Sequence, residues 1–348
     1  MYIFLKKMLT QEQYQQIKEE LDNCKNPLYF FDDDPDGLSS FLLLYRYKRE
    51  GHGIVVKTHP KLDIRSVPRL EDYKPDKVFV LDVANLEQDF IDNCPETIIW
   101  IDHHGPYERE DVKYFNPRLQ KKDDNIPTTC MCYNVVKQDL WIAMLGCIAD
   151  YHLPDFIDKF KKEYPDLMNN KKSVADIYFN TKLGELIRVF SFSLKGKTNE
   201  VMKNVKILTR IKSPYEILNQ ETPQGKFIFK RYQKMKKLYD ELMEEAVKSN
   251  PKDKLLVFTY DDNKMSFTSD LANELLYKHP DKIILVGRKK DDDIRMSLRS
   301  TKTVIPQILE KALMGLEGYG GGHELACGAS IKQRDFKEFV ERMRESVN

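Results

Sequence analysis

The residues best suited to chemistry are carboxylates and imidazoles that follow apolar segments. Asp102, His103 and His104 come directly after the apolar run 98–101, and Asp82 ends another such run. Short β-branched runs of this kind are typical of buried parallel strands, whose carboxyl ends form the edge at which open α/β sheets bind ligands. Polar residues at a strand end also occur in plain turns, so the neighbouring motifs decide between the two interpretations.

A second acidic segment lies near the N-terminus. The apolar run 28–31 breaks into Asp32, Asp34 and Asp36, and Gly37 then precedes a helical, apolar segment. Two carboxylates spaced Asp-x-Asp in a turn can be directed at neighbouring cations. An acidic turn that only caps a helix is the alternative, and it stays open for Asp32.

A buried helix is predicted over residues 140–149, and it ends at Asp150. Three apolar elements therefore end in a carboxylate, at Asp82, Asp102 and Asp150. Burying three carboxylates close together is unfavourable unless a cation neutralises them. The sequence thus indicates a metal site.

The spacing of the apolar runs predicts the fold class. Strand-like runs near residues 28, 54, 78 and 98 alternate with helix-length segments, a pattern of βαβ units and a mainly parallel sheet. We expect an α/β protein with a parallel-sheet, metal-binding N-terminal domain at 1–150, a helical connector at 151–250 with a long helix over 227–246, and a smaller C-terminal α/β substrate-binding domain at 251–348.

Composition suits this organisation. Acidic residues outnumber basic ones in residues 1–150, and the reverse holds in 151–250, which suits a cation site beside a surface for a polyanion such as nucleic acid.

Six cysteines without CxxC spacing indicate reduced thiols. No apolar run is long enough to span a bilayer and no cleavable leader is apparent, so we expect a cytoplasmic protein without membrane contact.

The C-terminal part holds a further candidate site. Gly320, Gly321 and Gly322 precede His323, and Arg299 lies on a predicted strand. Consecutive glycines let backbone N–H groups approach a phosphate closely, and arginine matches phosphate oxygens in a bidentate manner. Taken alone, the glycine run is equally typical of a flexible turn.

In their order along the chain, these motifs resemble those of the DHH phosphoesterases. The N-terminal motifs that carry the resemblance are Asp32-x-Asp34-x-Asp36-Gly37, Asp82, Asp102-His103-His104 and Asp150. The C-terminal motifs, which resemble the DHH-associated domain, are Ser297-x-Arg299 and Gly320-Gly321-Gly322-His323. The chain is most similar to RecJ-like single-strand exonucleases, including the archaeal type, and to nano-RNase and pAp-phosphatase enzymes.

The resemblance implies a two-metal site that uses Mn²⁺, with Mg²⁺ as an alternative. The implied metal ligands are Asp32, Asp34, Asp36, Asp82, His103 and Asp150. The implied catalytic residues are Asp102, His103 and His104, with His104 as charge stabiliser or proton donor. The implied substrate-binding residues are Ser297, Arg299, Gly320, Gly321, Gly322 and His323. Several relatives have a histidine where this chain has Phe30, so either Asp32 replaces that ligand or the first ion binds weakly.

The implied function is Mn²⁺-dependent hydrolysis of phosphodiester bonds in single-stranded DNA or RNA from an end, as in DNA repair. One alternative is a nano-RNase or pAp phosphatase that acts on short oligonucleotides. Another is a replication-complex scaffold with little activity. The implied partners are single-stranded nucleic acid and a helicase or another replication or repair protein.

Overall fold

The computed structural model describes residues 9–57, 61–122, 124–169, 173–248, 253–261 and 265–347. The chain divides into two compact units, residues 1–232 and 233–348, and the division falls inside helix α13 (Pro223–Lys248). The domain boundary expected at residues 250 and 251 lies outside the described residues. Among the helices of the described ranges, none has both the length and the apolar character needed to cross a membrane.

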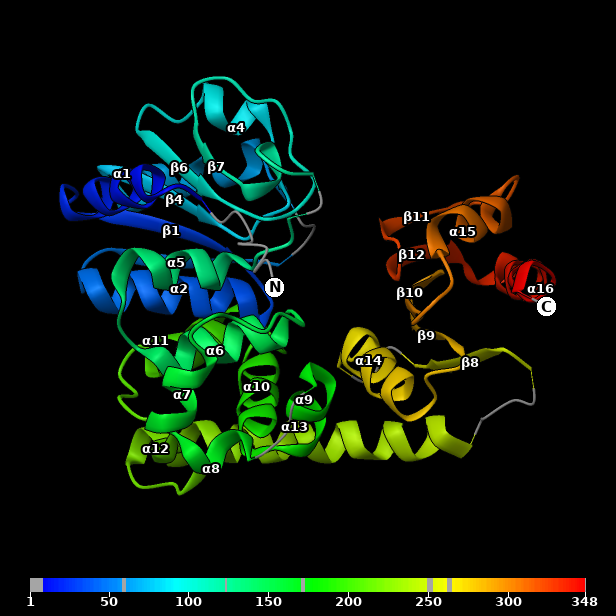
Figure 1. Cartoon of the computed structure of the whole chain (residues 1–348). Coiled ribbons are helices and arrows are strands. Elements are labelled where there is room, and N and C mark those ends of the chain that lie inside the picture. Colours follow the sequence, from blue (N-terminus) through cyan, green and yellow to red (C-terminus); the bar gives the residue numbers. More distant parts are fainter. Residues whose placement is uncertain are drawn as a thin grey trace, which may run out of the picture. The chain divides into compact units, whose positions relative to one another are not determined.

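The first unit is built on a parallel sheet with the strand order β2-β1-β4-β6-β7 (Figure 1). Its strands are β1 (Pro27–Asp32), β2 (His52–Val56), β4 (Lys77–Leu81), β6 (Thr97–Ile101) and β7 (Lys113–Phe115). The first four are the strands expected from the sequence. A separate two-stranded sheet pairs β3 (Lys61–Leu62) with β5 (Asn85–Leu86).

Helices cover both faces of this sheet, which explains why its strands are apolar almost throughout. On one face Phe31 stacks on Phe41, with ring centroids 4.7 Å apart. On the other face Phe30 meets Phe90 edge to face at 5.7 Å. The helices around the sheet are α1 (Gln11–Asp22), α2 (Pro35–Lys48), α3 (Pro68–Tyr73), α4 (Gln88–Asp92) and α5 (Thr128–Val136), and single 3-10 turns span Ile64–Ser66 and Pro117–Leu119.

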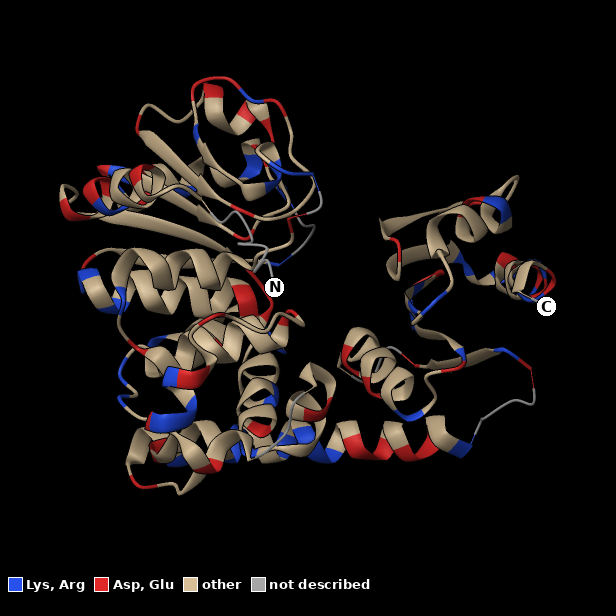
Figure 2. Ribbon diagram, in the orientation of Figure 1, with Lys and Arg blue, Asp and Glu red and all other residues tan. Residues whose placement is uncertain are grey.

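A helical region completes the first unit, beginning with α6 (Leu140–Ala149), which packs on α2. It continues through α7 (Ile157–Glu163), α8 (Pro165–Met168), α9 (Val174–Asn180), α10 (Lys182–Ser193), α11 (Thr198–Leu208) and α12 (Pro214–Leu218). The long helix expected over 227–246 is α13, and Figure 2 shows charges of both signs along it. Its apolar positions are buried, as the helical spacing predicts, at Tyr232, Met235, Tyr239, Leu242 and Ala246.

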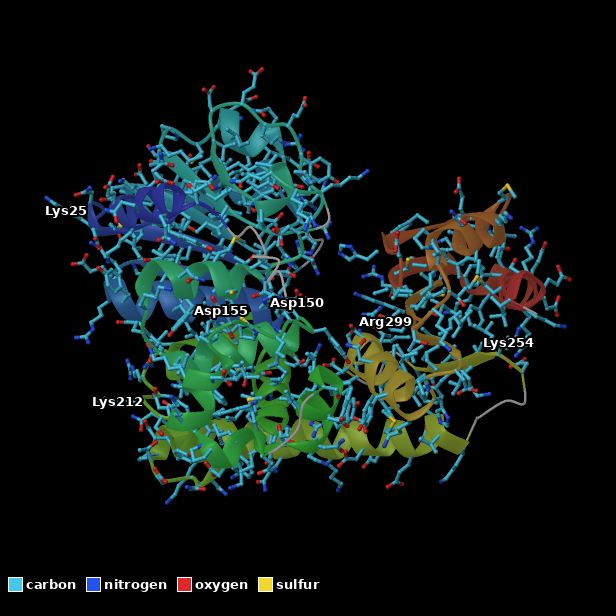
Figure 3. The ribbon with its side chains drawn as sticks, viewed as in Figure 1. Lys25, Asp150, Asp155, Lys212, Lys254 and Arg299 are labelled. Atoms are coloured by element: carbon cyan, nitrogen blue, oxygen red, sulfur yellow. The ribbon has the colours of Figure 1, made fainter. Side chains whose placement is uncertain are left out.

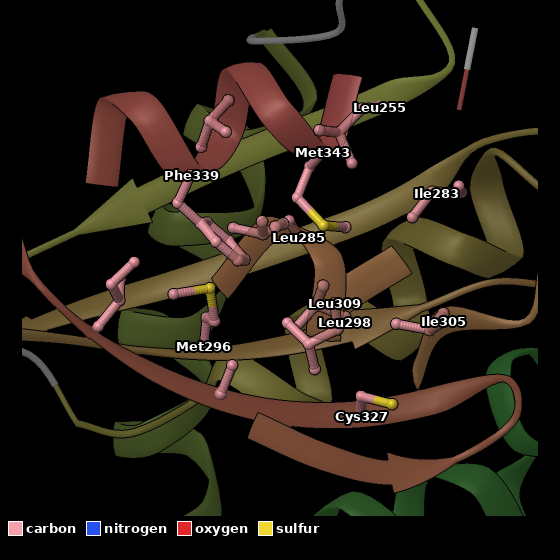
Figure 4. Close-up of a cluster of buried hydrophobic side chains, with 14 of the residues drawn as sticks. Leu255, Ile283, Leu285, Met296, Leu298, Ile305, Leu309, Cys327, Phe339 and Met343 are labelled. Carbon is pink, nitrogen blue, oxygen red and sulfur yellow. The ribbon is translucent and has the colours of Figure 1, made fainter. Parts of the chain in front are cut away.

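The second unit has a mixed sheet with the order β11-β12-β10-β9-β8, in which only the pair β8 and β9 is parallel. Its strands are β8 (Leu255–Tyr260), β9 (Ile283–Lys290), β10 (Asp293–Arg299), β11 (Gly318–His323) and β12 (Ala326–Lys332). Its helices are α14 (Thr268–Lys278), α15 (Ile305–Leu313) and α16 (Phe336–Val347), with a 3-10 turn at Gln333–Asp335. Figure 4 shows the core between the sheet and the helices α15 and α16, where Leu285, Leu298 and Phe339 are fully buried.

The glycine run 320–322 is part of a strand. It belongs to β11, an edge strand that pairs with β12 and has all six residues exposed. Glycine is unfavourable inside strands because it has no side chain to pack. Propensity therefore favours a turn here, and it is the antiparallel pairing with β12 that makes the segment extended.

Candidate active site

The strand register brings the acidic residues to one edge of the parallel sheet. Phe31 pairs with Leu81, and Leu81 pairs with Ile101. The residues that directly follow Phe31, Leu81 and Ile101 are Asp32, Asp82 and Asp102, so these three carboxylates lie side by side at the carboxyl edge. The chain leaves β1 toward β2 on one side and later returns to β4 on the other. The gap between β1 and β4 is thus the topological switch point, where open α/β sheets bind ligands.

The acidic turn after β1 also forms the start of helix α2. Asp34 is the N-cap residue, and its Oδ1 accepts a hydrogen bond from the backbone N–H of Gly37 at 2.9 Å. A Cβ atom on Gly37 would lie 2.7 Å from both the backbone N and O of Asp32. Glycine therefore lets the helix begin directly against the strand end, which keeps Asp32, Asp34 and Asp36 together.

Helix α5 begins at the carboxylate of Asp36, which is 2% exposed. The backbone N–H groups of Thr128 and Thr129 donate to Asp36 Oδ2 and Oδ1 at 3.0 and 2.7 Å, and the Thr128 hydroxyl donates to Asp82 Oδ1 at 3.1 Å. The amino end of a helix stabilises an anion in this way. Neither threonine is among the site residues expected from the sequence. The signal that points to them is a Pro-Thr-Thr run at the start of a helix.

Carboxylates and imidazoles form three overlapping groups with the spacing of metal ligands, and two of them consist of metal ligands expected from the sequence. One group is Asp32, Asp34 and Asp82, and the other is Asp36, His103 and Asp150; within each group the ligand atoms lie within 4.8 Å of one another. His103 Nε2 connects the groups because it lies 3.3 Å from Asp82 Oδ1 and 3.8 Å from Asp36 Oδ2. The six ligands expected from the sequence are thus all gathered at this edge.

The tautomer of His103 suits a metal ligand. Its Nδ1 lies 2.9 Å from Asn125 Oδ1, an acceptor, which favours the tautomer that has its proton on Nδ1 and leaves Nε2, on the side of Asp82, to bind a metal. Hydrogen bonds of this kind fix the orientation of metal-binding histidines. Asn125 had no signal in the sequence that distinguishes it from a loop asparagine.

These groups fit a divalent cation. Asp150 lies at the end of α6 (Figure 3), and its Oδ2 is buried without a hydrogen-bond partner among the described residues. Burial raises the pKa of Asp150 to about 7. Burial, followed by the charge of neighbouring carboxylates, also raises the pKa values of Asp32 and Asp82. A cation would relieve both effects, and carboxylate oxygens with one imidazole suit Mn²⁺ or Mg²⁺.

Asp102 lies outside the two ligand groups defined above. Its buried carboxylate accepts hydrogen bonds from His104 through the backbone N–H at 3.0 Å and Nδ1 at 2.8 Å. Tyr114 Oη and Asn116 Nδ2 donate to the same carboxylate at 3.3 Å each. Asp102 therefore fixes the orientation of His104. Burial lowers the pKa of His104, but the hydrogen bond and charge of Asp102 outweigh it and raise the pKa to about 9.

His104 also takes part in a third possible grouping, with Asp82 and His103. Its ring centroid lies 4.6 Å from that of His103. Both catalytic histidines expected from the sequence are thus at the carboxyl edge. Phe30 lies in the hydrophobic core beside Phe90, away from these groups, and Asp32 stands in the group with Asp34 and Asp82.

In the second unit Ser297 and Arg299 contact helix α14. The Arg299 guanidinium (Figure 3) donates to Asn273 Oδ1 and Ser269 Oγ, both at 2.7 Å. Ser297 Oγ donates to Thr268 Oγ1 at 3.2 Å. These contacts hold the beginning of α14 against β10.

The glycine run borders a pocket of about 360 Å³ in the second unit. Gly320 and Gly321 line it together with Arg295 and Tyr319. Gly322, which has a φ of 146°, and His323 follow at the end of β11. The first two residues of the glycine run thus border the pocket.

Comparison with solved structures found the same fold at low sequence identity. RecJ from Thermus thermophilus in complex with Mn²⁺ has a TM-score of 0.69 and 14% identity, over 97% of this chain and 54% of that chain. An exonuclease RecJ bound to manganese has a TM-score of 0.60 and 13% identity, over 97% and 93%. A DHH domain described as belonging to a family of ribosomal proteins has a TM-score of 0.65 and 14% identity, over 97% and 89%. This chain thus spans about half the length of the Thermus RecJ.

Family models match both units. Residues 28–168 match the model described as the DHH family, N-terminal domain, and residues 252–348 match the DHHA1 domain. No curated protein was found to match the sequence. The two models together span most of the chain, in the order that the motifs predict, and the RecJ-like fold agrees with them. The chain therefore belongs to the DHH family of metal-dependent phosphoesterases.

Proposed function

We propose that this protein is a Mn²⁺-dependent exonuclease that hydrolyses phosphodiester bonds of single-stranded DNA or RNA from an end. The observation that carries the proposal is the pair of ligand groups joined by the 3.3 Å approach of His103 Nε2 to Asp82 Oδ1. Family membership and the RecJ-like fold support the same reaction class. One neighbour of comparable length is itself described as an exonuclease bound to manganese.

Two divalent ions would be held by Asp32, Asp34 and Asp82 on one side and by Asp36, His103 and Asp150 on the other. When bound, such ions neutralise charge on the phosphate oxygens and lower the pKa of water so that it can attack at neutral pH. The protein supplies the ligand positions. Thr128 and Thr129 hold Asp36 and Asp82, so these two carboxylates are oriented before a metal or substrate arrives.

His104 is the residue that we assign to charge stabilisation or proton donation. Asp102 engages its Nδ1, so the proton available to a substrate is the one on Nε2. The hydrogen bond and charge of Asp102 raise the pKa of His104 in the metal-free protein, and an imidazole in its charged form would stabilise negative charge that develops on a phosphate or its leaving oxygen.

The second unit would bind the end of the strand. Backbone groups of Gly320 and Gly321 line the 360 Å³ pocket, and Arg295 adds a positive charge to it. In this proposal, cleavage proceeds from an end because a terminal nucleotide occupies the pocket. Arg299 contributes by keeping α14 in place as well as by its charge.

The test is the degradation of end-labelled single-stranded DNA and RNA, from two to about 40 nucleotides, in Mn²⁺, Mg²⁺ or EDTA. We expect progressive loss of nucleotides from one end of long strands in Mn²⁺ and none in EDTA. Asp36→Ala, which removes a ligand, is the matched inactive control. Turnover restricted to the shortest oligomers would replace the proposal with a nano-RNase function, and lack of turnover on every substrate would indicate a scaffold.

A further inference from the structure

An aromatic side chain directly follows one of the proposed metal ligands. Tyr151 comes after Asp150, and adjacent Cα atoms are about 3.8 Å apart. Tyr151 is 45% exposed, although the Oδ2 atom of the preceding Asp150 is buried. Leu153, two residues later, is 41% exposed. The loop after α6 therefore presents apolar surface to solvent beside the candidate metal site.

One face of the Tyr151 ring is supported by a second aromatic ring. Tyr178 of α9 stacks on Tyr151, with centroids 5.8 Å apart and planes 18° from parallel. Tyr178 is buried and also contacts Phe179 at 4.7 Å. Stacking on a buried ring restrains the tilt of Tyr151, while the exposure of Tyr151 leaves ring surface open to solvent. A supported, flat and partly exposed ring is the form of side chain on which nucleobases stack.

The backbone at Tyr151 is in a conformation that tyrosine rarely adopts. Its φ is 54°, and the N–H groups of Tyr151 and His152 close the end of α6 by bonding to Ile148 O and Cys147 O. Glycine is the usual residue at this position of a helix end. A bulky aromatic residue held there at a free-energy cost is the kind of outlier found at functional sites.

We propose that Tyr151, supported by Tyr178, binds the base of a nucleotide next to the scissile phosphate. This inference rests on the proposed function and adds a substrate requirement to it. Tyr151 directly follows Asp150 in the chain, so a nucleotide whose phosphate lies at the ligand groups would have its sugar and base near the loop that carries this ring. Because every base has a π face, the contact favours nucleotides over other phosphoesters without selecting a base sequence.

The test compares a single-stranded DNA pentamer with a fully abasic pentamer of the same length and charge. Tyr151→Gly removes the ring and suits the local φ, so the backbone need not change. Tyr151→Phe keeps the ring and is the matched control. We measure kcat/KM with Mn²⁺, and we measure equilibrium binding of both fluorescently labelled oligomers to the metal-free protein by anisotropy.

We expect Tyr151→Gly to lower kcat/KM and affinity for the normal pentamer by about tenfold, because this is the size of effect that the stacking of one base on an aromatic ring contributes. For the abasic pentamer, kcat/KM and affinity of Tyr151→Gly should stay within about twofold of the wild-type values. Tyr151→Phe should resemble the wild type on both pentamers. Equal losses on both oligomers, or no loss on either, would overturn the inference. If the wild type hydrolyses neither oligomer, the proposed function fails, and the binding measurement still decides the role of Tyr151.

Discussion

Asp82 combines two unfavourable features at a single residue. It is 1% exposed, and its φ of 62° lies in the left-handed region. Burial and then the charges of Asp36 and Asp34 raise its pKa in the metal-free protein. Such features persist where a site depends on them, and a bound cation would turn this carboxylate from a destabilising group into a stabilising one.

Asp82→Asn should therefore change stability in opposite directions with and without metal. Asparagine keeps an oxygen for the Thr128 hydroxyl but carries no charge. In EDTA we expect the free energy of unfolding to rise by about 1–3 kcal/mol, whereas the stabilisation by Mn²⁺ should be largely lost. Urea unfolding in EDTA and in Mn²⁺ measures these two changes in the free energy of unfolding. Asp76→Asn is the control. The Asp76 carboxylate accepts hydrogen bonds from the backbone N–H groups of Lys25 and Asn26, and the effect of this substitution on the free energy of unfolding should not depend on metal. Destabilisation of Asp82→Asn in EDTA would contradict this view of the site.

His104 and His103 are neighbours in the chain with different surroundings. His103 lies among carboxylates that could share a cation with it, while His104 is held by Asp102. We expect His104→Ala to lower kcat by about 10² to 10⁴. The affinity of this variant for Mn²⁺, measured by calorimetry, should differ little from that of the wild type. A large loss of Mn²⁺ affinity would instead make His104 a ligand, in the grouping with Asp82 and His103.

At the scale of elements, the strand ends were predictable and the helix contacts were not. Apolar runs that stop at Asp82 and Asp102 define both a strand and its carboxyl edge, so a local pattern suffices. The bonds from Thr128 and Thr129 to Asp36 join residues about 90 positions apart. No local pattern encodes such a pairing, because the packing of α5 against α2 creates it.

The role of Asp102 shows the same limit. Its position after a strand predicts a residue at the edge, but Tyr114 and Asn116, which bond to its carboxylate, come from the next strand and the turn after it. The strand β11 is a different case, since its glycines favour a turn and only pairing with β12 makes them extended.

Helix α2 and strand β1 meet at a point where only glycine fits. Gly37→Ala would place a methyl group 2.7 Å from backbone atoms of Asp32, which cannot move aside as a side chain can. We expect a loss of about 1–3 kcal/mol in the free energy of unfolding and weaker binding of Mn²⁺, because the first carboxylates must separate. Thermal unfolding with and without Mn²⁺ tests this.

Gly105→Ala is the matched control for this change. Gly105 follows the histidines at the same edge, and a Cβ there meets no atom within 4 Å. The control should keep both stability and Mn²⁺ binding. Equal effects of the two substitutions would mean that the close approach of α2 to β1 is not what orders the site.

For the whole molecule, the raised pKa values predict an unusual dependence of stability on pH. Between about pH 4 and 7 the folded protein keeps a proton on Asp150 that the unfolded chain has lost. The free energy of unfolding of the metal-free protein should therefore fall as pH rises through this range, by on the order of 2–4 kcal/mol.

Urea unfolding in EDTA at pH 5 to 8 measures this fall, and Mn²⁺ should abolish it because the cation replaces the proton. Asp150→Asn is the control and should make the fall in EDTA smaller, while the raised pKa values of Asp32, Asp82 and His104 account for the fall that remains. A metal-free protein whose stability rises from pH 5 to 7, with the same profile in Asp150→Asn, would contradict the prediction.

The crowding of buried carboxylates at the sheet edge also bears on how long the protein survives in a cell. A ligand that binds only the folded form shifts the balance away from open forms, and proteases cut open forms. When the metal is scarce, the metal-free protein should be degraded faster than the metal-bound one. The abundance of the protein would then follow the supply of metal without any change in synthesis, and removal of the metal-free molecules would leave mainly metal-bound copies.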